Sequence, residues 1–189
     1  MKRRIVIALA AFGLLGLAAV WAAGSILSWP ENSFVPAPEP PGRVVHLTAS
    51  DGVPIEGSYW AGSTADGPAV LLLHGVRSSR ASFDRQAAWL NGLGYAVLAI
   101  DFRGHGGSGA VPRSFGLHEA RDAAAALAFL KRDAPSRRVA VIANSLGGAA
   151  VLLGERLQSV VPVHAIRLAG AALFLLVGFL VAVNALQIG

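Results

Sequence analysis

The chain has 189 residues, enough for one domain of ordinary size, but it is 54% hydrophobic and only 14% charged, which is more apolar than an average soluble domain. It contains no cysteine, which excludes disulfides, thiolate catalysis and cysteine-ligated zinc. Its net charge of +5 comes from scattered basic residues without interleaved aromatic residues, a pattern that argues against binding to nucleic acid.

The N-terminal segment is basic and then apolar. Lys2, Arg3 and Arg4 precede residues 5–27, in which Ser25 is the only clearly polar residue. A helix of that length spans about 35 Å, enough for a hydrocarbon core of about 30 Å. We therefore expect residues 1–29 to form a membrane anchor with a cytoplasmic N-terminus and the rest of the chain outside. A cleaved signal peptide is the alternative.

Residues 30–43 contain five of the ten prolines, which predicts an extended linker. Two strands follow. Residues 44–48 and 55–60 flank the turn dipeptide Asp51-Gly52, a pattern typical of an antiparallel hairpin at a sheet edge.

Three short apolar runs come next, at residues 69–73, 96–100 and 139–143. Continuous apolar runs are typical of parallel strands that are buried on both faces by helices. Helical periodicity lies between and after them, around residues 83–90, 117–131 and 147–157. The order predicts an α/β domain over residues 44–157, with a mostly parallel sheet and helices on both faces.

The third buried strand leads directly into Asn144-Ser145-Leu146-Gly147-Gly148 and a helix. A strand, a tight turn with small residues around a serine, and a helix form the nucleophile elbow, with Ala143 and Gly147 as the small residues. The hydroxyl of Ser145 would then project from the sheet edge beside the N-terminus of the helix. The alternative is an ordinary serine N-cap.

Together these motifs resemble the α/β-hydrolase family, in particular its serine-peptidase/lysophospholipase-like and esterase-like members. The resemblance covers the N-terminal half of that fold. It implies Ser145 as nucleophile, the backbone N–H groups of Val76 and Leu146 as the oxyanion hole, and hydrolysis of a small ester, thioester, lipid or peptide-like substrate through an acyl-enzyme. It implies no cofactor and no metal. The matching segments are LLLHG at 71–75, AIDFRGHGGSG at 99–109, FGLHEARDAAAALAFL at 115–130 and VIANSLGGAA at 141–150.

Two motif residues have structural explanations. We interpret His74 as a packing residue of its turn and Asp101 as an acceptor for nearby backbone N–H groups. Residues 104–109 also fit the pattern G-x-G-x-x-G of dinucleotide sites. That fingerprint opens a helix directly, whereas here Val111 and Pro112 follow, so we reject it.

A serine nucleophile needs a base that is oriented by a third group. The family order is Ser, acid, His, but His164 is the only histidine after Ser145 and no acid follows Glu155. No triad acid or histidine is therefore identifiable, and His105 or His118 would have to substitute. We expect a hydrolase that is catalytically incomplete, or else a non-catalytic membrane protein, a hydrolase remnant or a fusion.

The C-terminal residues predict a linker at 158–167 and a second membrane helix at 168–188. Residues 161–183 resemble the last membrane helix of a family of manganese/calcium–proton antiporters. The acidic transport motif of that family is absent, so a transporter fragment is the weaker alternative. The expected location is the cell membrane, with the lipid bilayer as partner, the hydrolase domain outside the cytoplasm and no bound nucleic acid.

Overall fold

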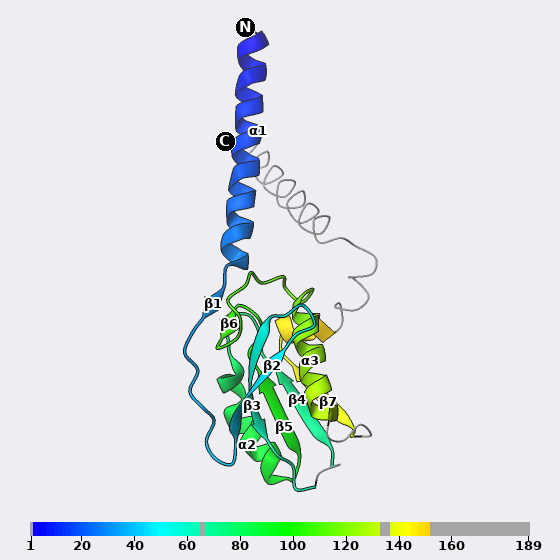
Figure 1. The fold of residues 1–189 in the computed structure, drawn as a ribbon. Helices are drawn as coiled ribbons and strands as arrows, with labels where there is room; N and C mark the ends of the chain where they lie inside the picture. The colour runs from blue at the N-terminus through cyan, green and yellow to red at the C-terminus, as the bar shows by residue number, and fades with distance from the viewer. Residues whose placement is uncertain (1, 65–66, 133–136, 152–189) are drawn as a thin grey trace, which may run out of the picture. The chain divides into compact units, whose positions relative to one another are not determined.

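A computed structural model describes residues 2–64, 67–132 and 137–151 (Figure 1). The chain divides into two compact units, one of residues 1–28 with 158–189 and the other of residues 29–157. The predicted linker at 158–167 and the predicted membrane helix at 168–188 lie outside the described residues.

The described part of the first unit is the helix α1, Lys2–Ser28. Its abundance of alanine and leucine favours a helix in any solvent. Near its end the Ser25 hydroxyl donates to the carbonyl of Trp21 at 2.9 Å. Among the described residues, no helix combines the length and the apolar character needed to cross a membrane. The predicted membrane-spanning character of residues 1–29 is therefore not supported, although a helix forms there.

The second unit contains a five-stranded mixed sheet in the order β2-β3-β5-β4-β7. The pairs β2–β3 and β3–β5 are antiparallel, and the pairs β5–β4 and β4–β7 are parallel. This confirms the predicted partial α/β-hydrolase sheet, with its hairpin at one edge. The strands are β2 (Arg43–Thr48), β3 (Pro54–Trp60), β4 (Ala69–Leu73), β5 (Ala96–Ile100) and β7 (Val139–Ala143).

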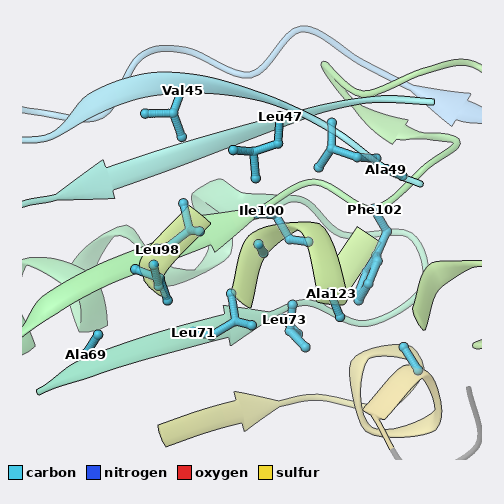
Figure 2. Packing of buried hydrophobic residues seen from close by; sticks show 14 of the residues in the cluster. Val45, Leu47, Ala49, Ala69, Leu71, Leu73, Leu98, Ile100, Phe102 and Ala123 are labelled. Carbon is cyan, nitrogen blue, oxygen red and sulfur yellow. The ribbon is translucent and has the colours of Figure 1, made fainter. Parts of the chain in front are cut away.

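Helices cover both faces of this sheet because β4 and β5 alternate their apolar side chains between two cores. One core contains Leu71 and Ile100 and is closed by α3 (Glu119–Arg132) through Ala126 and its neighbours (Figure 2). The other contains Leu72 and is closed by α2 (Asp84–Gly92), which follows the short 3₁₀ helix η1 (Arg80–Phe83).

The expected linker at 30–43 begins with a short strand. β1 (Glu31–Asn32) pairs in parallel with β6 (His105–Gly106). The Asn32 side-chain amide donates to three carbonyls around β6, those of His105 at 3.4 Å, Gly106 at 3.1 Å and Ser108 at 2.6 Å. The segment after β1 is irregular, as its prolines predict.

The parallel strands β5, β4 and β7 end at the same edge of the sheet, which is where ligands bind in open α/β sheets. Three loops leave this edge, at residues 74–79, 101–109 and 144–145. Among the described residues β7 has only one neighbouring strand, and its Val141 and Ile142 side chains are 42% and 48% exposed.

Candidate active site

Ser145 sits at a sharp turn between β7 and the helical residues 146–151, with a backbone φ of 47°. Left-handed backbone costs a non-glycine residue about 1–2 kcal/mol. An ordinary N-cap residue has extended dihedrals, so the angle favours the elbow over the N-cap. The Asn144 N–H donates to the Leu73 carbonyl at 2.9 Å, and the Gly147 N–H donates to the Asn144 carbonyl at 2.9 Å. These bonds hold the turn in place.

The backbone next to Ser145 passes close to β4 and to the loop that follows it. A Cβ on Gly147 would lie 2.6 Å from the carbonyl oxygen of Leu73 and 2.7 Å from its Cβ. A Cβ on Gly75 would lie 3.4 Å from the Cβ of Ser145. The loop after β4 therefore passes directly beside the serine, as the elbow geometry needs.

Backbone donors without an acceptor lie on both sides of this turn. Among the described residues, neither the N–H of Val76 nor that of Leu146 donates a hydrogen bond. The Ser145 side chain is exposed, and within the same part of the chain its hydroxyl has no hydrogen-bond partner. Within the described part of the chain, the hydroxyl and the two donors therefore have no hydrogen-bond partner.

His74 is a structural residue, as expected. It is buried, and its Nε2 accepts from the Phe102 N–H at 3.1 Å, so its Nδ1 carries the proton and donates to the Gly75 carbonyl at 2.7 Å. The pKa of His74 is lowered to about 4, mainly by burial and to a smaller extent by the nearby His105 ring. Because both nitrogens are occupied and the ring is neutral, His74 cannot act as the base.

Asp101 is a turn acceptor, which the sequence predicted, but its main partner was missed. The carboxylate accepts from the Gly107 N–H at 3.0 Å and from the Arg80 N–H at 2.7 Å, and it also binds the Arg80 guanidinium. Arg80 is 1% exposed. A lone arginine in a loop has no sequence pattern that marks it as buried.

A second buried arginine, Arg103, links the same loop to α3. Its guanidinium binds Asp122 at 2.7 Å and Asp51 at 2.7 Å. The Arg103 guanidinium holds the pKa of Asp51 well below its usual range, whereas burial raises the pKa of Asp122 to about 6. The glycine-rich residues 104–109 make a turn and the short strand β6, and α3 begins only at Glu119, so these glycines do not open a helix directly.

Among the described residues, neither of the two histidines that could replace the missing base is hydrogen-bonded to Ser145. His105 is buried, with Nδ1 3.1 Å from the Arg103 carbonyl oxygen, and His118 is half-buried before α3. Burial lowers the pKa of both rings. His164 and Glu155 lie outside the described residues. Within residues 2–64, 67–132 and 137–151, no group of three or more acidic or histidine side chains could hold a metal ion.

Comparisons with known proteins agree with this geometry. The family model of serine aminopeptidase S33 matches residues 66–176, which includes the elbow and extends past the predicted domain end at residue 157. None of the comparisons shows the antiporter resemblance expected at residues 161–183.

Among curated proteins, an uncharacterized protein of Mycobacterium tuberculosis (strain CDC 1551) is 34% identical over 160 residues, which are 81% of this chain and 55% of that protein. A non-heme haloperoxidase of Rhodococcus erythropolis is 37% identical over 106 residues, 56% of this chain and 36% of that one. The chain thus spans about half the length, or less, of these relatives.

Among solved structures, the esterase Pf2001 of Pyrococcus furiosus superposes with a TM-score of 0.56 at 29% identity, over 64% of this chain and 50% of the esterase. The residues matched by the family model, 66–176, include Ser145. The chain belongs to the serine aminopeptidase S33 family and has an α/β-hydrolase-type fold.

Proposed function

We propose that the protein hydrolyses esters through an acyl-enzyme on Ser145. The observation that carries the proposal is the left-handed backbone of Ser145 at the junction of β7 and a helix. That conformation is costly, and strained residues of this kind are concentrated at functional sites. Esters are the preferred class because the esterase of Pyrococcus furiosus is a structural neighbour; thioesters and amides react by the same steps.

In the proposed reaction the Ser145 Oγ forms a bond to the carbonyl carbon of the substrate, and the serine proton passes to a base. The carbonyl oxygen becomes an oxyanion that accepts hydrogen bonds from the N–H groups of Val76 and Leu146. The alcohol leaves with a proton, and water then attacks the acyl-enzyme by the same path. Each oxyanion donor contributes a factor of about 10²–10³ to the rate in comparable enzymes.

The base is the open part of this proposal. No described histidine is hydrogen-bonded to Ser145, which leaves His105, His118 and His164 for direct testing by substitution to glutamine. Loss of turnover in one of these variants, with the fold retained, would identify the base. Equal rates in all three would place it elsewhere.

The test of the nucleophile uses a fluorophosphonate probe and p-nitrophenyl acetate on the purified full chain. We expect probe labelling at Ser145 and ester turnover, both abolished in Ser145→Ala. The matched control is Ser63→Ala, which removes an exposed hydroxyl beside the carbonyl of Gly94 and should change neither signal. If folded protein shows no labelling, the second candidate holds, a catalytically incomplete hydrolase remnant or interaction module.

Membrane attachment and an extracytoplasmic location stay predictions of the apolar N-terminal sequence. Cell fractionation with alkaline carbonate tests them: recovery in the washed membrane pellet supports attachment, and recovery in the supernatant contradicts it. A manganese flux assay in vesicles tests the weaker transporter alternative, for which we expect no signal.

A further inference from the structure

Arg80 is a buried charge with partners on three separate segments. Its Nε donates to the Ser58 hydroxyl at 3.1 Å, and one Nη donates to Glu56 at 2.5 Å and to the Val35 carbonyl at 3.3 Å. The other Nη binds Asp101. A buried cation is tolerated only when it is paired and hydrogen-bonded, and these contacts satisfy that condition.

Arg80 lies directly after the loop that carries one of the two proposed oxyanion donors. Residues 74–79 form the loop between β4 and η1, and that loop carries Val76. Its first residue, His74, accepts from the Phe102 N–H at 3.1 Å, while the N–H of Arg80, just after its end, donates to Asp101 at 2.7 Å. Two consecutive residues at the end of β5 therefore hold both ends of the loop.

The loop itself needs such support. Arg77 has a left-handed φ of 60°, a conformation that costs a non-glycine residue free energy. The Arg77 side chain is 79% exposed and forms an ion pair with Glu31 at 3.5 Å, which is weak at a surface. The buried contacts of His74 and Arg80 therefore carry most of the restraint on the loop.

We propose that Arg80 is a positioning residue for the oxyanion hole. Its guanidinium group binds Asp101, Glu56 and Ser58, and these contacts fix the loop that carries the Val76 N–H beside Ser145. The inference rests on the proposed function for its catalytic effect. Arg80 touches no substrate atom in this proposal. It acts on the rate of the chemical step, because a displaced donor weakens the transition state more than the bound ester.

The experiment compares Arg80→Lys with Arg103→Lys in the full chain. Both changes keep a buried positive charge and remove a guanidinium fork on carboxylates. The Arg103 guanidinium pairs with Asp122 and Asp51, and among the described residues it forms no hydrogen bond or ion pair with residues 74–79. For p-nitrophenyl acetate we expect Arg80→Lys to lower kcat by roughly tenfold to 100-fold with KM changed less than about twofold. Arg103→Lys should lower the midpoint of urea unfolding but leave kcat within about twofold.

Hydrogen exchange gives a readout that does not depend on activity. In Arg80→Lys the amides of residues 74–79 should exchange at least about tenfold faster, while those of β4 stay protected. If Arg80→Lys does not fold, Ser58→Ala, which removes only the acceptor of Nε, should give the same local change at a smaller size. Unchanged exchange of residues 74–79, or equal loss of kcat in Arg103→Lys, would overturn the proposal. An inactive wild type would refute the proposed function, and the exchange result would still decide the position of the loop.

Discussion

Ser145 and Gly147 illustrate how single residues set the geometry of the elbow. The left-handed φ of Ser145 costs about 1–2 kcal/mol, and the paired Asn144 N–H and Leu73 carbonyl offset part of that cost. Two residues later the backbone passes so close to Leu73 that a side chain has no room. The requirement for glycine at position 147 is therefore steric. This steric effect can be measured separately from the effect of glycine on helix propensity.

We predict that Gly147→Ala destabilises the fold by about 2–3 kcal/mol, because its Cβ would lie 2.6 Å from the backbone oxygen of Leu73 in β4. Gly148→Ala is the matched control. A Cβ at Gly148 meets nothing within 4 Å, so alanine there should stabilise the helix by about 0.5–1 kcal/mol. Urea unfolding of both variants measures the two free energies. Similar values for the two would contradict the steric explanation.

At the scale of elements, β4 and β7 are neighbours with opposite surroundings. β4 lies between β5 and β7, and all five of its residues are buried. β7 has the same apolar composition, but in the part of the chain that the structure describes it is an edge strand with exposed side chains. An exposed apolar edge favours pairing with further chain and is a site for aggregation.

Because of this contrast, we predict that substitution by alanine lowers the free energy of unfolding by different amounts at two paired positions of β4 and β7. Leu72 and Ile142 are register partners, and Leu72 is fully buried whereas Ile142 is 48% exposed. Leu72→Ala should therefore cost about 2–5 kcal/mol of unfolding free energy, and Ile142→Ala less than about 1 kcal/mol. Urea unfolding of the full chain distinguishes the two. A cost above about 2 kcal/mol for Ile142→Ala would mean that further chain covers β7.

The regular elements could be predicted from the sequence because each one has a local pattern. The three apolar runs at 69–73, 96–100 and 139–143 coincide with β4, β5 and β7. The helix expected over 117–131 is α3, displaced by one or two residues. The elbow was recognisable because a strand, small residues and a helix are adjacent in the chain.

The contacts that organise the site had no such local signal. β1 pairs with β6 across more than seventy residues, through two residues each, and neither has strand periodicity. Arg80 binds Ser58 on β3, Asp101 directly after β5, and the carbonyl of Val35. These three partners are far from one another in the sequence. Long-range contacts between irregular segments depend on the finished fold, so composition and spacing do not reveal them.

At the scale of the second unit, buried ionisable groups are concentrated at the edge where the parallel strands end. Arg80, Arg103 and Asp101 are each at most 3% exposed, and His74 and His105 are each 1% exposed. The histidine rings lie edge to face, with centroids 5.0 Å apart. Groups that are buried in this way titrate differently in the folded and unfolded chains, and the stability of the unit then depends on pH.

We predict that acid destabilises the fold through His74. Its folded pKa of about 4 lies below the unfolded value of about 6.5, so between these values the unfolded chain binds the proton and the folded chain does not. The contribution of the neutral ring is complete above about pH 6.5 and is lost as the pH falls toward 4. The groups that face His74 are Asp101, which favours its protonation, and His105, which opposes it. Between pH 7 and pH 5 the loss should be about 2 kcal/mol.

Urea unfolding at pH 7 and pH 5 measures this loss, and His74→Gln should remove most of it, because an amide can accept from the Phe102 N–H without titrating. His46→Gln is the comparison variant, because it replaces an exposed histidine instead of a buried one; the His46 side chain is 78% exposed. His105→Gln separates the two buried rings, since it removes the repulsion that opposes protonation of His74 and should reduce the acid loss. If His74→Gln kept the full pH dependence, the neutral ring between Gly75 and Phe102 would not be its source, and protonation elsewhere in the unit would have to account for the acid sensitivity.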